Sequence, residues 1–158
     1  HQYPYYPGTG AINEVGAGPG EGYTINIPLP AGCSDQEYME VFQHVVIPAA
    51  ERFQPEWILV SAGFDPHRRD PLGGMRVSEE GFGGMADALF AVARRFSDAR
   101  IALALEGGYD LAALSNSVAA VLSALEQEKA PQNGGLRLSD SRIEPLIRRV
   151  LKLHESYQ

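Results

Sequence analysis

Residues 59–71 read LVSAGFDPHRRDP, and no other stretch of the chain is as informative about the fold. The apolar run at residues 57–62 is apolar on both faces, as the central strand of a parallel sheet is. Directly behind this run come a carboxylate, Asp65, and a loop that Pro66 and Pro71 stiffen. The stretch therefore predicts a buried strand that leads into an acidic residue held in a rigid loop.

Strand-like and helix-like segments alternate on both sides of this stretch. Buried strands that alternate with amphipathic helices predict an α/β fold, with a parallel sheet flanked by helices on both faces. Pro48 is expected to kink the first helix or to end it early. Strands are predicted at residues 22–30, 57–62 and 101–108. Helices are predicted from the capping box at Ser34 to Ala49, from Ser78 to Phe96, from Asp110 to about Leu125, and from a second capping box at Ser141 to Leu151. The residues of the third helix expected to face inward are Leu111, Leu114, Val118, Val121 and Leu125.

Length, charge and cysteine content limit the class of protein. The chain has 158 residues, 44% of them hydrophobic, so one domain is expected over residues 1–158, with a linker-like loop at 130–140 before the last helix. The net charge of −7 argues against a nucleic-acid or anionic-membrane partner. No run approaches the roughly 20 apolar residues of a membrane span. The single cysteine, Cys33, excludes an internal disulfide, and a cytoplasmic protein is expected.

Two loops follow predicted strands and should lie at the carboxyl edge of the sheet, where open α/β folds bind ligands. They are GFDPHRRDPLGGM, residues 63–75, and LEGGYD, residues 105–110. Asp65 in the first loop is either an acceptor for loop amides or an oxygen ligand of a divalent metal, and both interpretations stay open. Tyr109 in the second loop either packs or donates a hydrogen bond to a developing oxyanion.

The other polar residues of these loops have simpler interpretations. His67 is expected at the surface beside the arginines that follow it, and Asp70 is expected to pair with an arginine or to cap the turn before Pro71. The glycines at residues 16–22 precede a predicted strand instead of following one, so a dinucleotide-binding site is rejected there.

Three motifs together resemble consecutive signatures of the histone deacetylase superfamily. They are YYPGTG at residues 5–10, SAGFDPHRRDPLGG at 61–74 and LEGGYD at 105–110. The similarity runs from about residue 1 to residue 125, in the family's order and spacing. It is greatest to the class II, acetoin-utilisation and acetylpolyamine-hydrolase branches. The resemblance implies an arginase-like α/β fold around a central parallel sheet, and zinc-dependent hydrolysis of acetyl-lysine or acetylpolyamine-type amides.

The resemblance also implies roles for individual residues. Asp65 corresponds to the last of three zinc ligands, and Tyr109 to the tyrosine that hydrogen-bonds the substrate carbonyl and the tetrahedral intermediate. The backbone at Tyr23 corresponds to a position where the family often binds a second, monovalent cation, K⁺ or Na⁺. The positions that correspond to the walls of the substrate tunnel are Tyr6, Leu72, Gly107 and Gly108.

One departure from the family pattern concerns the metal. The family's other two zinc ligands, an Asp and a His two residues apart, and its paired catalytic histidines precede the segment that resembles residues 1–10. We therefore expect the C-terminal portion of a deacetylase, which binds little zinc and has little activity alone. Such a portion is expected to form a homo-oligomer, because it exposes sheet edges and helix faces. The alternatives are a non-catalytic deacetylase-like fragment that acts as an oligomerising or interaction module, and an unrelated α/β protein that binds a small molecule.

Overall fold

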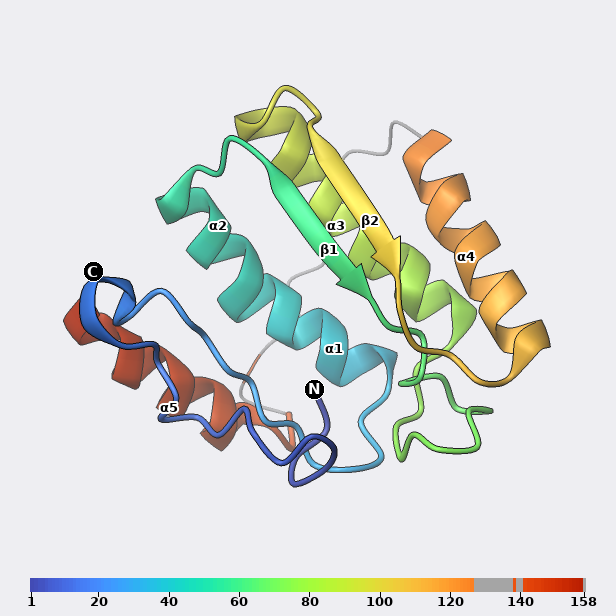
Figure 1. Cartoon of the computed structure of the whole chain (residues 1–158), viewed down its shortest axis with the longest axis horizontal. Coiled ribbons are helices and arrows are strands. Elements are labelled where there is room, and N and C mark those ends of the chain that lie inside the picture. The colour runs from blue at the N-terminus through green and yellow to red at the C-terminus, as the bar shows by residue number, and fades with distance from the viewer. Residues whose placement is uncertain (127–137, 139–140, 158) are drawn as a thin grey trace. The chain divides into compact units, whose positions relative to one another are not determined.

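A computed structural model describes residues 1–126, 138 and 141–157 of the chain (Figure 1). The loop predicted at residues 130–140 lies outside the described residues, apart from Leu138. None of the helices in the described part is both long and apolar enough to span a membrane.

The described residues belong to two compact units. The larger unit is Gly32–Leu136, and the smaller unit combines His1–Ala31 with Arg137–Gln158. The expectation of one domain over residues 1–158 stays a prediction. All the strand-to-helix loops that the sequence singled out at the carboxyl edge of the sheet belong to the larger unit.

The larger unit is built on a parallel pair of strands, β1 (Ile58–Ala62) and β2 (Ile101–Leu105). Ile58 pairs with Ile101, and the pairing continues residue by residue to the ends of both strands. The long helix α3 (Glu79–Phe96) lies behind the two strands in Figure 1. The predicted α/β fold, a parallel sheet flanked by helices, is confirmed.

The helices α3 and α4 (Leu111–Glu126) approach each other closely through small side chains. A Cβ placed on Gly83 of α3 would lie 3.6 Å from the Cβ of Ala120 on α4. Of the five residues of α4 predicted to face inward, Leu114, Val118 and Val121 are partly buried. The prediction is wrong for Leu111 and Leu125, which are both exposed. A contact as close as this has no room for leucine, and the buried residues of α4 are accordingly Ala113, Ser117 and Ala124.

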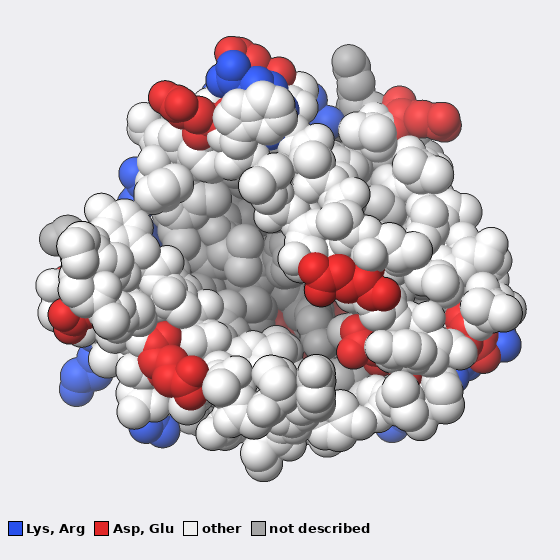
Figure 2. All heavy atoms as spheres, viewed as in Figure 1, with Lys and Arg blue, Asp and Glu red and all other residues white. Residues whose placement is uncertain are grey.

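One face of the sheet is exposed in the described part of the chain. Leu59 is 78% exposed, and its neighbour in the pairing, Ala102, is exposed as well. Ile101, on the opposite face, packs against the cluster that α3 and α4 form. The surface over the two strands is largely uncharged (Figure 2). The sequence predicted buried strands that are apolar on both faces. In the described residues the face of Ile101 is covered only in part, because Leu103 and Leu105 on the same side of β2 are 40% and 60% exposed.

The first helix of the larger unit continues through Pro48 and does not end early. The helix α1 (Asp35–Val41) leads into a π-helical turn (Phe42–Val46) and then into α2 (Ile47–Phe53). Proline has no N–H and its ring clashes with the carbonyl four residues before it. The π turn changes this spacing, since Ile47 donates its N–H to the carbonyl oxygen five residues back. The helix start is as predicted, with a complete capping box at Ser34.

The smaller unit differs from the sequence prediction at residues 22–30. These residues form no strand, and an isolated bridge joins Leu29 to Gln2. Pro28 and Pro30 have no N–H to contribute to a ladder, so a continuous strand is disfavoured. The last helix, α5 (Glu144–His154), forms as predicted.

The start of α5 differs in detail from the predicted capping box. Ser141 Oγ accepts the Ile143 N–H at 3.2 Å, and Ile143 is the residue that precedes the helix. The apolar face of α5 is buried as predicted, at Ile147 and Val150.

Candidate functional site

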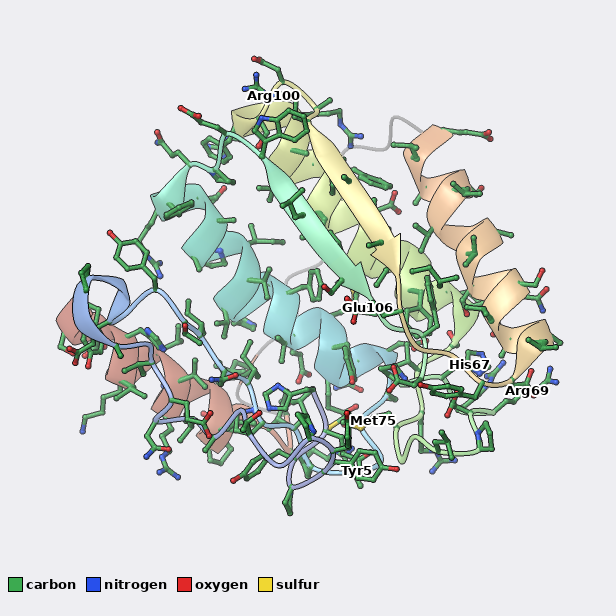
Figure 3. All side chains as sticks on the ribbon, viewed as in Figure 1. Tyr5, His67, Arg69, Met75, Arg100 and Glu106 are labelled. Atoms are coloured by element: carbon green, nitrogen blue, oxygen red, sulfur yellow. The ribbon has the colours of Figure 1, made fainter. Side chains whose placement is uncertain are left out.

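The two loops that follow β1 and β2 lie at the same end of the sheet. Figure 3 shows His67 and Arg69 in the loop after β1, and Glu106 directly after β2. Arg100, which precedes β2, lies at the opposite end. The carboxyl edge of the sheet therefore gathers the residues that the sequence singled out.

Backbone hydrogen bonds continue the strand pairing into these loops. Glu106 donates its N–H to the Ala62 carbonyl oxygen at 3.1 Å, and Phe64 donates its N–H to the Gly107 carbonyl oxygen at 2.8 Å. The next residue, Asp65, consequently lies against Gly107. A Cβ on Gly107 would be 2.9 Å from Asp65 Oδ1, closer than real Cβ atoms come to an oxygen. A larger residue at this position would have to displace the carboxylate.

At position 108 the backbone itself favours glycine, because the φ of +131° is a conformation that other residues rarely adopt. The Cα of Gly108 also packs tightly, since an added Cβ would lie 3.0 Å from the Cβ of Phe64 and 3.1 Å from Leu114 Cδ1. Gly108 is therefore needed to bring the second loop against the first, and Gly107 allows the close approach of the Asp65 carboxylate. Their lining of a substrate tunnel stays a prediction.

Asp70 connects the two loops directly. Its Oδ1 accepts the N–H groups of Leu72 at 2.9 Å and Gly73 at 3.0 Å, so it caps a turn within its own loop. Its Oδ2 accepts the N–H of Tyr109 at 2.7 Å, from the loop after β2. The Asp70 residue is only 9% exposed. The sequence predicted an arginine pair or a cap of the turn before Pro71, whereas Asp70 caps the turn after Pro71. The sequence did not indicate the bond to Tyr109.

An ion pair forms a second connection between the loops, at the surface. Arg69 Nη2 lies 3.1 Å from Asp110 Oδ2, and Asp110 Oδ1 accepts the Ala113 N–H at 2.8 Å as the cap of α4. The Ala113 N–H, followed by the charge of Arg69, holds the pKa of Asp110 below its usual value. The Arg69 side chain is half exposed, so solvent screens this ion pair and it contributes little to the free energy of folding.

The prediction that His67 lies at the surface is wrong, because the residue is 1% exposed. Its Nδ1 accepts the Arg69 N–H at 3.0 Å, and its Nε2 lies 3.3 Å from Glu79 Oε2 at the start of α3. The ring stacks on Phe82 of α3, with 10° between the ring planes. His67 therefore attaches the first loop to α3, a contact that no local sequence pattern encodes.

Tyr38 on α1 is a further buried polar residue near the site. Its hydroxyl has no hydrogen-bond partner within the part of the chain that the structure describes. Burial, followed by the nearby Cys33 and Asp65, raises the pKa of Tyr38 above its ordinary value, so the phenol is neutral. The sequence placed this residue only on the inward face of a helix.

The structure brings together five of the seven residues to which the resemblance assigned roles. Tyr109, 57% exposed, and Leu72, also exposed, both have their backbone N–H groups bound to the Asp70 carboxylate, and Asp65 lies against Gly107. Tyr6 and Tyr23 belong to the smaller unit, where both are exposed. Their assignments to the tunnel wall and to a monovalent cation stay predictions.

The candidate metal site is incomplete within the described residues. These contain no group of three or more His, Cys, Asp or Glu side chains that is placed to hold a metal ion. Protein zinc sites use three or four such ligands, so Asp65 by itself does not fit a zinc ion. Asp65 contributes one carboxylate side chain at the carboxyl edge of the sheet.

Comparisons with known proteins agree with the three sequence motifs. The family model described as histone deacetylase domain matches residues 1–125. "Histone deacetylase 10, chloroplastic" of Oryza sativa subsp. japonica is 48% identical over 119 residues, which cover 75% of this chain and 27% of that protein. "Probable deacetylase" of Archaeoglobus fulgidus is 43% identical over 111 residues, which cover 70% of this chain and 31% of that protein.

Solved structures give the same result. The histone deacetylase Clr3 superposes with a TM-score of 0.85 at 32% identity, over all of this chain and 27% of that one. The HDA15 HD domain superposes with a TM-score of 0.80 at 36% identity, over 98% of this chain and 40% of that one. The chain therefore belongs to the histone deacetylase family, and it spans about a third or less of the length of the two curated relatives named above.

Three glycine substitutions test the close packing at the candidate site. Gly73→Ala is expected to lower the free energy of unfolding most, by about 2–3 kcal/mol, because its Cβ would overlap the Asp65 carbonyl oxygen and the backbone must move. Gly107→Ala is expected to cost about 1 kcal/mol, because the Asp65 carboxylate can rotate away.

Gly20→Ala is the matched control for these variants, since nothing lies within 4 Å of its added Cβ. Urea unfolding of the three variants measures their free energies of unfolding, which are expected to be lowest for Gly73→Ala and highest for Gly20→Ala. Equal stability of Gly73→Ala and Gly20→Ala would contradict the packing described for the first loop.

Proposed function

We propose that this chain carries part of the site of a zinc-dependent deacetylase that hydrolyses an acetylated amine, such as an acetyl-lysine side chain or an acetylpolyamine. The observation that supports this proposal is the juxtaposition of the Asp65 and Tyr109 loops at the carboxyl edge of the sheet, in a chain of the histone deacetylase family. Activity and substrate belong to the proposal, since the chain spans 27% and 31% of the two curated relatives described above.

In the proposed reaction, water adds to the amide carbonyl carbon, the C–N bond breaks, and acetate and a free amine leave. The Tyr109 hydroxyl donates a hydrogen bond to the carbonyl oxygen, whose negative charge grows as water adds. Asp65 would contribute one carboxylate ligand to a metal. Zinc, and K⁺ or Na⁺ at the Tyr23 backbone, remain part of the proposal, because the described residues contain no group of three or more side chains placed to hold a metal ion. The cytoplasmic location expected from the sequence also stays a prediction.

The exposed sheet face supports a second candidate function, that of an oligomerising module. Leu59 is the most exposed apolar side chain of the strands, and β1 and β2 each have one edge without a strand partner among the described residues. Exposed apolar faces and open strand edges favour association. We propose that a second copy of the chain covers this face.

The first prediction from the proposed function concerns zinc. The 158-residue chain is expected to retain well under one zinc ion per molecule after dialysis, because one carboxylate ligand does not hold zinc tightly. Elemental analysis of the dialysed chain measures this directly. One retained zinc per chain that Asp65→Ala removes would reveal a complete site.

The second prediction concerns turnover in the protein at its natural length. Tyr109→Phe is expected to lower kcat by about 10²–10³, because the oxyanion loses one hydrogen-bond donor while the ring remains. Tyr157→Phe is the control, since its hydroxyl binds Glu21 in the smaller unit. Deacetylation of a fluorogenic acetyl-lysine peptide and of an acetylpolyamine gives the rates. Unchanged turnover of both substrates in Tyr109→Phe would remove the tyrosine from the proposed reaction.

The third prediction concerns association. Light scattering at micromolar concentration is expected to detect a dimer or a larger oligomer of the 158-residue chain. Leu59→Gln is expected to shift the chain toward monomer, because it places an amide on the exposed sheet face. Leu122→Gln on α4 is the control, since Leu122 is also exposed but lies outside the sheet. A monomeric wild-type chain, or an equal effect of both variants, would contradict association through the sheet.

A further inference from the structure

We propose that Asp70 is a positioning residue, which fixes the backbone of Tyr109 against the Asp65 loop and thereby sets the direction of the Tyr109 hydroxyl. The inference rests on the proposed function and goes further, by assigning a role to a residue that touches neither substrate nor metal. Its basis is a buried carboxylate that binds the main chain of both loops.

The hydrogen-bonding pattern of Asp70 requires a carboxylate. Oδ1 accepts two N–H groups, from Leu72 and Gly73, and Oδ2 accepts the third, from Tyr109. All three partners are donors, so both oxygens must act as acceptors. Hydrogen bonds to an ionised acceptor are the strong ones, and the bond to Tyr109 is the shortest of the three at 2.7 Å. The neighbouring Arg69 is paired with Asp110.

On one side, Asp70 holds the turn that supports Asp65. Gly73, whose N–H binds Asp70, packs so closely against the Asp65 backbone that an added Cβ would overlap the Asp65 carbonyl oxygen. A shift of the turn at Leu72 and Gly73 therefore shifts Asp65 as well. The backbone of Gly73 packs directly on the backbone of Asp65, so no flexible side chain can absorb a change in the distance between them.

On the other side, Asp70 holds the peptide between Gly108 and Tyr109. Gly108 is packed against Phe64, and the residue after Tyr109 is Asp110, the cap of α4. The Tyr109 side chain is 57% exposed, so packing contributes little to its direction. The orientation of its Cα–Cβ bond therefore depends on the backbone, and the backbone N–H is bound by Asp70.

These two sides make one carboxylate responsible for the relative position of Asp65 and Tyr109. In the proposed reaction, the Asp65 carboxylate would be one ligand of a metal, and the Tyr109 hydroxyl donates a hydrogen bond to the carbonyl oxygen. A misplacement of about 1 Å between groups that act on one substrate can cost about 10²-fold in rate. The surface pair Arg69–Asp110 spans the same two loops but is half exposed, which makes it a matched comparison.

The test is Asp70→Asn, which keeps the shape of the side chain but replaces one acceptor oxygen by an NH₂ group. The amide oxygen can serve either the turn or Tyr109, and the NH₂ group then faces an N–H donor on the other side. In the natural-length protein, kcat is expected to fall about 10- to 100-fold with KM changed less than about threefold. Arg69→Gln is expected to leave both constants within about twofold of the wild-type values.

A double variant separates positioning from a general loss of structure. Because Asp70 sets the position of the Tyr109 hydroxyl relative to Asp65, a variant without this hydroxyl has less to lose. Asp70→Asn is therefore expected to add less than its full single-variant loss in a Tyr109→Phe background. Losses that multiply fully would overturn the inference, as would near-normal kcat in Asp70→Asn. Asp70→Glu keeps both oxygens on a longer arm and is expected to restore part of the lost kcat.

Amide hydrogen exchange provides a readout independent of activity. In Asp70→Asn, the Tyr109 N–H is expected to lose at least tenfold in protection, while amides inside α3 keep theirs. Unchanged protection at Tyr109 would overturn the inference. A wild-type protein that hydrolyses neither the acetyl-lysine peptide nor the acetylpolyamine would overturn the proposed function instead, and the exchange at Tyr109 would still decide whether Asp70 holds this backbone.

Discussion

The register between β1 and β2 is the constraint on which the candidate site depends. Two parallel strands that end at the same level direct both of their loops to one edge, and the bond from Phe64 N–H to the Gly107 carbonyl oxygen keeps the loops paired beyond the strands. A slip of one residue would turn every side chain of one strand to the other face. Asp65 would then no longer lie against Gly107.

Beyond the strands, polar contacts replace apolar packing. A buried carboxylate is costly unless its oxygens are hydrogen-bonded, and Asp70 has three N–H partners. His67 acts similarly on the side of α3, where it combines ring stacking with a contact to Glu79. The loop of residues 63–75 is therefore fixed in three directions, by β1, by the second loop and by α3. Such rigidity suits a site whose groups must keep fixed distances.

The same unit combines this fixed edge with an exposed sheet face. Strands that are apolar on both faces belong in the centre of a layered fold, yet Leu59 is open to solvent in the described structure. The exposed sheet face and the incomplete metal site both leave the unit open to further protein. Within the described residues, the unit presents one rigid part of a site and an apolar surface on which further protein can pack.

The sequence by itself determined the features that depend on near neighbours in the chain. The capping box at Ser34 and the caps at Ser78 and Asp110 predicted three helix starts, and two-faced apolar runs predicted β1 and β2. Three short motifs were sufficient to predict the family that the comparisons confirm. Such signals are readable because caps, turns and periodicity act over a few residues.

Only the tertiary structure decided which distant groups meet. Asp70 and Tyr109 are 39 residues apart, His67 is buried by a helix that follows its loop, and residues 22–30 form no strand where the local pattern predicted one. The physical reason is that a local pattern sets the preference of the backbone, whereas the partner of a carboxylate, a ring or a strand edge is set by packing across the whole unit.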